Sequence, residues 1–255
     1  MCELFGYTSK TPTRMDEYLV RFFEHSVDHP DGWGLAEFGQ GEVRVTRQTI
    51  CANASHVIPV ILDEKRSSYV IAHIRQATIG RVAPQNCHPF IGQDISGRTW
   101  YLAHNGTLNN GRLVEKFKNV QSGTTDSERV LLYLLELNNA EIEARNRPLD
   151  STERSKCVEI LCKNLAMQNS LNLIIFDGEQ MYIHGNIDGC LHYKKTDSEV
   201  LFSTRPLGRF GWDQIPLSRV LTFKDGALIR EGESHGFRMP RFCTIQDAQK
   251  NLLSA

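Results

Sequence analysis

The amino-acid sequence predicts an α+β fold in which two mostly antiparallel β-sheets carry helices on their outer sides. Three observations lead to this prediction. Strand-like apolar segments dominate residues 2–107 and return after residue 170, and two long helical segments lie between these regions. The third observation is a hairpin signal, because Asp225-Gly226 supplies positive-φ residues for a two-residue turn between apolar strands. The hydrophobic pattern alone does not tell whether the two sheets face each other.

In the first part of the chain we expect a strand at 2–7 and then an amphipathic helix within residues 11–27. Met15, Leu19 and Phe22 recur there at helical spacing on an otherwise polar segment. Strands are predicted at 33–38, 42–48, 69–75 and 99–105, with a short helix at 54–64. The last two of these strands end in polar residues and glycine, and functional residues often lie at such strand ends.

In the rest of the chain, segments 124–146 and 151–168 are predicted to be helices. Each begins with a Ser/Thr residue ahead of Glu, in the pattern of a capping box. Further strands are expected at 171–176, 180–185, 199–204, 219–224 and 227–231. Because no repeat, low-complexity tract or linker-like stretch interrupts the sequence, residues 1–255 are predicted to form a single domain.

Composition narrows the classes of partner and compartment. Of the 255 residues, 40% are hydrophobic and 23% charged, and a net charge of −1 gives no reason to expect a nucleic acid or a membrane as partner. The sequence has no apolar run long enough to cross a bilayer and no recognisable secretory signal. Seven cysteines without a CxxC pair indicate neither a disulfide framework nor a zinc site. We therefore expect a reducing, cytoplasmic location, no metal and no cofactor.

Cysteine has the most reactive side chain among the amino acids, and Cys2 becomes amino-terminal if Met1 is removed. It would then combine a thiol with a free α-amino group, which is a nucleophile with a base in reach. The reference pKa of such an amine is about 7.7–8.0, so it can be neutral near physiological pH. His73 and His104 are interpreted as structural residues, and either one is the alternative base. Taken alone, Cys2 is better explained as a small residue that begins a strand.

A thiol that cleaves an amide also needs donors for the oxyanion and groups that hold the substrate. Asn105-Gly106 offers a side-chain amide and a backbone N–H for the oxyanion. Arg75 could bind a carboxylate through two parallel hydrogen bonds, and Asp126 could bind an ammonium group. Each residue also has a structural explanation as a turn, a strand end or a first-turn helix acid. Their joint occurrence with Cys2 favours a site for glutamine or a γ-glutamyl amide.

Five segments in this order, MCELFGY, HIRQATIG, NCHPF, HNGTL and GTTDSE, resemble the class II glutamine amidotransferases, which are N-terminal nucleophile (Ntn) hydrolases. The resemblance extends from Cys2 to about residue 235 and implies a four-layer αββα sandwich with the active site at one edge. It implies that Cys2 is the nucleophile with its own amine as base, and that Asn105 and Gly106 form the oxyanion hole. It also implies that Arg75 binds the substrate carboxylate, that Asp126 binds the substrate amine, and that Thr78 lines the pocket. PDGWG (30–34) would lie beside the nucleophile, and Asn86 and Pro89 would be structural residues.

Two residues depart from the sugar-phosphate and purine branches of that family. Gln76 stands where those branches commonly have an aromatic residue, and Ile79 stands where they have a histidine. Only a short tail follows the last predicted hairpin, so we expect no acceptor domain. The sequence is therefore more similar to stand-alone members, such as those that cleave γ-glutamyl amides.

The predicted function is that of an amidohydrolase acting on a small molecule. It would cleave the side-chain amide of glutamine or a γ-glutamyl amide through a thioester on Cys2 and release glutamate plus ammonia or an amine. The first alternative is a catalytically silent domain that binds a metabolite or a partner protein. The second is an ammonia-supplying subunit, which would need a partner subunit that accepts the ammonia. The sequence does not choose the leaving group.

Overall fold

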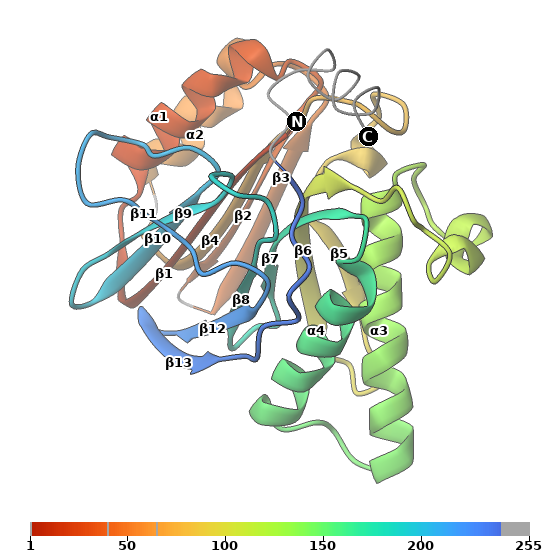
Figure 1. Ribbon diagram of the computed structural model, residues 1–255. Helices are drawn as coiled ribbons and strands as arrows, with labels where there is room; N and C mark the ends of the chain where they lie inside the picture. Colours follow the sequence, from red (N-terminus) through yellow and green to blue (C-terminus); the bar gives the residue numbers. More distant parts are fainter. Residues whose placement is uncertain (1, 40, 65, 241–255) are drawn as a thin grey trace.

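The computed structural model of the chain describes residues 2–39, 41–64 and 66–240. Two antiparallel sheets lie between two pairs of helices (Figure 1). The helices are α1 (Asp16–Glu24), α2 (Val57–Glu64), α3 (Asp126–Arg145) and α4 (Ser151–Leu165), with short 3-10 helices at η1 (His25–Asp28), η2 (Ala52–Ala54), η3 (Pro84–Asn86) and η4 (Glu115–Asn119).

The seven-stranded sheet has the order β11-β9-β10-β1-β4-β2-β3. Its strands are β1 (Glu3–Thr13), β2 (Trp33–Gly39), β3 (Glu42–Gln48), β4 (Ser67–Ile74), β9 (His192–Lys195), β10 (Glu199–Ser203) and β11 (Asp213–Gln214). β1 lies in the interior of this sheet and pairs with β10 on one side and with β4 on the other. Cys2 therefore directly precedes a central strand.

The six-stranded sheet has the order β13-β12-β8-β7-β6-β5. Its strands are β5 (Phe90–Gln93), β6 (Thr99–Thr107), β7 (Ser170–Phe176), β8 (Met181–His184), β12 (Val220–Lys224) and β13 (Ala227–Glu231). β6 carries the HNG segment at its end and pairs there with the start of β7.

Three hydrophobic cores show the four layers of the αββα sandwich. One core packs α1 and α2 on the outer face of the seven-stranded sheet, and Phe22 and Trp33 are buried in it. A second core packs α3 and α4 on the outer face of the six-stranded sheet. The third lies between the sheets and joins Leu4 and Phe202 to Ile174 of the opposite sheet. Because the strand residues alternate between an outer core and the central core, both faces of each sheet are apolar. The predicted fold class is confirmed.

Several predicted boundaries are wrong although the elements exist. β1 continues to Thr13, so residues 11–13 are strand and α1 begins only at Asp16. The strands β5, β9 and β11 were not predicted, because each is only two to four residues long. The hairpin prediction is confirmed, since Asp225 and Gly226 have φ angles of 50° and 75°.

The predicted caps of the two long helices are right in part. Thr125 caps α3, and its hydroxyl accepts the N–H of Glu128. The Glu128 carboxylate does not complete a capping box but accepts the N–H groups of Ser122 and Gly123. The cap of α4 is Asp150 rather than a serine or threonine, and with Glu153 it forms a full capping box.

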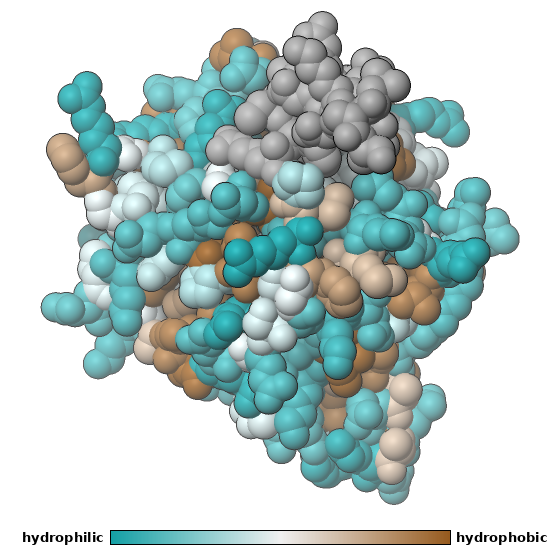
Figure 2. Space-filling model, in the orientation of Figure 1, coloured by the Kyte–Doolittle hydropathy of each residue, from teal (hydrophilic) through white to brown (hydrophobic). Residues whose placement is uncertain are grey.

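The face of the molecule shown in Figure 2 is mainly hydrophilic. On the face shown in Figure 2, hydrophobic residues lie in small separate areas. No helix among the described residues has the length and apolar composition needed to cross a membrane.

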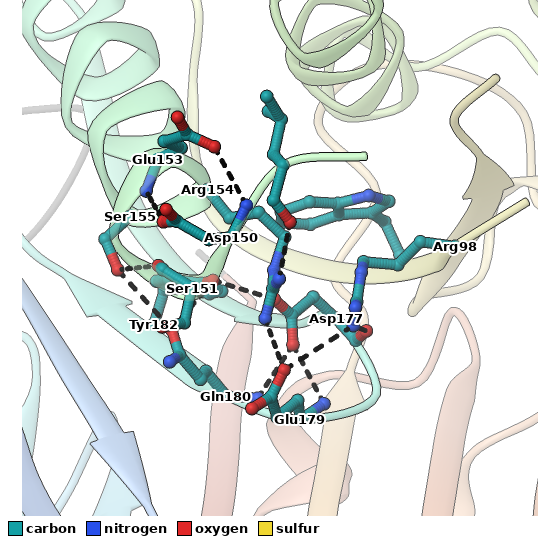
Figure 3. A network of polar contacts seen from close by, with 12 residues as sticks. Arg98, Asp150, Ser151, Glu153, Arg154, Ser155, Asp177, Glu179, Gln180 and Tyr182 are labelled. Carbon is teal, nitrogen blue, oxygen red and sulfur yellow. Dashed lines mark hydrogen bonds and ion pairs between the residues drawn. The ribbon is translucent and has the colours of Figure 1, made fainter. Parts of the chain in front are cut away.

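A buried ion pair fastens α4 to the turn between β7 and β8 (Figure 3). The Arg154 Nε donates to Asp177 Oδ2 over 2.6 Å, and the two side chains are 3% and 0% exposed. The Tyr182 hydroxyl donates to the same carboxylate oxygen. Breaking such a pair from one side leaves an uncompensated buried charge.

We expect Arg154→Met to lower the free energy of unfolding by about 3–5 kcal/mol, because Asp177 would stay buried without its cation. Arg147→Met is the matched control, since Arg147 pairs with Glu153 while its side chain is 51% exposed. Because solvent screens an exposed ion pair, the loss in this control should be much smaller. Urea unfolding followed by circular dichroism measures both losses, and equal losses would contradict the assignment of Arg154 as a structural anchor.

Candidate active site

Cys2 lies beside the segment that follows β4. Its Sγ is 3.3 Å from the carbonyl oxygen of Gln76, to which it donates, and 3.4 Å from the Gln76 nitrogen. The residue is half-buried. Burial raises the pKa of the Cys2 thiol. The thiol is therefore protonated at neutral pH and needs a base before it can act as a nucleophile.

Glu3, the residue after Cys2, is held by hydrogen bonds and an ion pair on the outer side of the seven-stranded sheet. The buried carboxylate of Glu3 accepts hydrogen bonds from His25 Nδ1 at 2.8 Å and from His29 Nε2 at 3.2 Å, and it pairs with Arg205. Burial acts to raise the pKa of Glu3, but the two histidines and Arg205 outweigh it and lower this pKa to about 2. Sequence analysis did not identify this anchor, although an acid beside Cys2 and two histidines four residues apart were a visible signal.

Arg75 follows β4 and is almost completely buried. Its guanidinium donates to the carbonyl oxygens of Ile79, Gly80 and Arg81 at 3.1–3.3 Å. It thus holds the loop that carries Thr78, which is exposed. The predicted contact of Arg75 with a substrate carboxylate, and that of Thr78 with the pocket, remain predictions.

The PDGWG segment lies beside the same loop. The backbone nitrogen of Arg75 donates to the Gly32 carbonyl at 2.7 Å, and the Asp31 carboxylate accepts the N–H of Ala77, also at 2.7 Å. These bonds surround Gln76, whose backbone contacts Cys2. The segment therefore packs against the loop that contacts the candidate nucleophile.

Asn105 and Gly106 lie at the end of β6. The Asn105 side chain is fully buried, and its Nδ2 donates to the Thr204 hydroxyl at 3.4 Å. Gly106 pairs with β7 so closely that a Cβ there would lie 1.9 Å from the Ser170 carbonyl oxygen. Only glycine fits this position. Glycine at this position therefore allows the close pairing of β6 with β7.

Asp126 is the first residue of α3, and it also fixes the HNGTL segment. Its Oδ2 accepts the N–H of Leu108 at 2.8 Å. The predicted contact of Asp126 with a substrate amine remains a prediction. Asn86 joins the neighbouring loops, since its side chain donates to the Arg81 carbonyl and to the Thr124 hydroxyl. This is the structural role expected of Asn86.

The histidines are poorly suited to act as the base. His104 Nε2 donates to the Ser170 carbonyl, so Nδ1 must accept from the Ser127 hydroxyl, and both ring nitrogens are occupied. His73 packs against His88 in the interior, with ring centroids 4.0 Å apart and the ring planes tilted by 40°. Burial, with help from nearby Arg75, lowers the pKa of His73 to about 3. An imidazole with so low a pKa is a weak proton acceptor.

The structure gathers most of the predicted residues at one end of the sandwich. The pairing of β1 with β4 sets Glu3 opposite Ile74, which brings Cys2 beside the segment of Arg75. Thr204 bridges the two sheets, because its hydroxyl also accepts the N–H of Leu4 at 2.9 Å. Within the described part of the chain, no group of three or more His, Cys, Asp or Glu residues could hold a metal ion.

Solved structures identify the class of this fold. A crystal structure of a glutamine amidotransferase homologue from Pseudomonas aeruginosa aligns with a TM-score of 0.63 and 22% identity over 90% of this chain and all of that one. The glutamine phosphoribosylpyrophosphate amidotransferase of B. subtilis aligns with a TM-score of 0.68 and 14% identity over 93% of this chain and 50% of that one. The fold is that of the Ntn-type glutamine amidotransferases.

Sequence comparison names the family. A family model for class-II glutamine amidotransferases matches residues 1–194, and the chain belongs to that family. A Haemophilus influenzae protein, provisionally named a glutamine amidotransferase, is 31% identical over 260 residues, covering 91% of this chain and 87% of that protein. An uncharacterized protein of Methanocaldococcus jannaschii is 28% identical over 257 residues, covering 90% of this chain and 71% of that one.

Proposed function

We propose that this protein hydrolyses the side-chain amide of glutamine or of a γ-glutamyl amide through a thioester on Cys2. The observation that carries the proposal is the hydroxyl of Thr204, which contacts both Leu4 and Asn105. This contact joins the strand that follows Cys2 to Asn105, which supports a role for Asn105 in stabilising the oxyanion. The half-buried thiol beside the Gln76 backbone supports the same role for Cys2.

The reaction would proceed in two stages. The α-amine of Cys2, freed by removal of Met1, takes the Sγ proton, and the sulfur attacks the amide carbon. The Asn105 amide and the Gly106 N–H stabilise the oxyanion. When the tetrahedral intermediate collapses, the C–N bond breaks and the leaving nitrogen takes the proton, giving ammonia or an amine. Water then attacks the thioester, which releases glutamate and restores the thiol.

Asn105→Ala is expected to lower kcat by about 10²–10³ with little change in KM, because one oxyanion donor is lost. Asn138→Ala is a control for removing a buried asparagine, since Asn138 lies within α3 and donates to the Leu134 carbonyl. Glutamate release measured over a range of substrate concentrations separates kcat from KM. A normal kcat in Asn105→Ala would mean that other groups stabilise the oxyanion.

Arg75→Lys is expected to raise KM by about 10–100-fold, because an ammonium group cannot make the paired bonds of a guanidinium. It would also release part of the loop at 79–81. Asp126→Asn should weaken recognition of the substrate amine to a similar degree. Arg81→Lys is the control, since Arg81 is exposed on the same loop. Normal KM values in both site variants would mean that the substrate pocket lies elsewhere.

A diazo-ketone analogue of glutamine tests the proposal against a catalytically silent domain. Covalent mass gain on Cys2 is expected, and its absence would favour the silent domain. A panel of γ-glutamyl compounds assayed for glutamate release then identifies the leaving group. A protein that co-purifies and consumes the ammonia would instead indicate the ammonia-supplying role.

A further inference from the structure

We propose that Thr204 is a positioning residue that holds the Asn105 amide in the orientation needed for the oxyanion. This inference rests on the proposed function, in which Asn105 stabilises the oxyanion. Thr204 immediately follows β10, in the sheet of the nucleophile, whereas Asn105 lies on β6 of the opposite sheet. One hydroxyl therefore links the two halves of the candidate site.

The Asn105 amide depends on Thr204 for its orientation. Among the described residues, the Thr204 hydroxyl is the only hydrogen-bond partner of the Asn105 side chain, whose Oδ1 is buried and unpaired. An amide nitrogen has two hydrogens. With one of them directed to Thr204, the other has a fixed direction and can point at the oxyanion. Without Thr204, rotation about the last side-chain bond is resisted only by packing.

Thr204 itself is fixed independently of Asn105. Its backbone nitrogen donates to the Leu4 carbonyl at 3.0 Å, while its hydroxyl accepts the Leu4 N–H at 2.9 Å. Its own carbonyl accepts a hydrogen bond from His192 Nδ1 at 3.1 Å. Two of these bonds hold Thr204 on β1, the strand that follows the nucleophile, and the third holds it on β9. Since Asn105 contributes none of them, Thr204 positions Asn105 and not the reverse.

The next residue strengthens this arrangement. Arg205 pairs with the buried Glu3 carboxylate, one residue after Cys2. Thr204 is therefore hydrogen-bonded to the backbone of Leu4, and Arg205 is paired with the side chain of Glu3. Glu3 and Leu4 are the two residues that follow the nucleophile. If the strand that follows the nucleophile moves, Thr204 moves with it and keeps its bond to Asn105. The distance between the Cys2 thiol and the Asn105 amide is therefore preserved. This is the pre-organisation on which oxyanion stabilisation depends.

The test compares Thr204→Val, which keeps the shape but cannot accept a hydrogen bond, with Thr204→Ser, which can. Thr204→Val should lower kcat by up to about 10²-fold with a smaller change in KM, as expected when a catalytic group is misplaced. Thr204→Ser should retain most of the activity. The matched control is Thr8→Val on the same β1–β4–β10 sheet, where the buried hydroxyl accepts the N–H of Gly226 far from the site. This control should lose stability without losing kcat.

A double variant shows whether Thr204 acts through Asn105. In the Asn105→Ala background, Thr204→Val should cause little further loss of kcat, because the group it positions is gone. Two results would overturn the inference: a kcat in Thr204→Val no lower than in Thr8→Val, or losses in the double variant that multiply.

A measurement without turnover separates this inference from the proposed reaction. The side-chain ¹⁵NH₂ signals of Asn105, observed by NMR, should shift or broaden in Thr204→Val and not in Thr8→Val. Unchanged Asn105 signals in Thr204→Val would overturn the inference even in an active enzyme. Shifted signals in a protein that releases no glutamate would support the positioning contact while refuting the proposed reaction.

Discussion

Replacing Cys2 by alanine is expected to abolish glutamate release, by a factor on the order of 10⁶ in kcat, while the fold stays intact. The thiol is the atom that forms the covalent bond, so no other residue can substitute for it. The structural loss is small, because Cys2 precedes β1 and the hydrogen bonds of its Sγ to described residues are those to the Gln76 backbone, at 3.3 and 3.4 Å. Alanine keeps the backbone conformation and the burial of Glu3.

Cys51→Ala is the matched control for this experiment. Cys51 is also half-buried and donates from its Sγ to a carbonyl, that of Ser26 at 3.2 Å, but it lies away from the HNG segment. Both variants are compared by glutamate release, by labelling with the diazo-ketone and by thermal unfolding. Loss of activity and of labelling only in the Cys2 variant is the expected result. Substantial glutamate release by Cys2→Ala would refute the thioester mechanism.

A chain that retains Met1 is expected to be inactive although its thiol is present. Met1 turns the α-amine of Cys2 into an amide nitrogen, which cannot accept a proton near neutral pH. Burial raises the pKa of the thiol, so very little thiolate forms without the base. Amide hydrolysis should appear only in the fraction that begins at Cys2, and an amino-terminal tag should have the same effect as Met1.

Intact-mass measurement beside a glutamate-release assay tests this expectation. The two fractions are prepared from one expression, with and without treatment by methionine aminopeptidase, so that only the first residue differs. Equal specific activity would refute the α-amine as base. A side-chain base would then be required, and His104 is a poor choice because both of its ring nitrogens are already bonded.

Much of the fold could be predicted because its signals are local. The apolar runs of β2, β4 and β7 and the stripe of Leu19, Phe22 and Phe23 on α1 each lie within one short segment. The turn at Asp225-Gly226 is determined by the residues that adopt it. The missed strands β9 and β11 are short and lie at or next to the edge of the sheet, where pairing with a neighbour decides the conformation more than the segment itself does.

The candidate site also has a part with local signals and a part that depends on distant residues. Cys2, Asn105, Gly106 and Asp126 could be proposed as site residues from the sequence, because each has a side chain or backbone suited to amide chemistry and lies at the end of an element. The partners of Arg75 could not be predicted from the sequence, because a guanidinium suits backbone carbonyls as well as a carboxylate. The structure shows the carbonyls of the loop at 79–81 as its partners.

The sequence by itself determined which residues could perform the chemistry and which segments would be helix or strand. Only the tertiary structure decided how those residues are held. Thr204 lies 200 positions from Leu4 and 99 from Asn105, and Arg205 lies 202 positions from Glu3. Such contacts follow from the pairing of β10 with β1 and from the stacking of the two sheets. No local pattern encodes them, because a hydrogen bond between distant residues depends on where the whole chain places its strands.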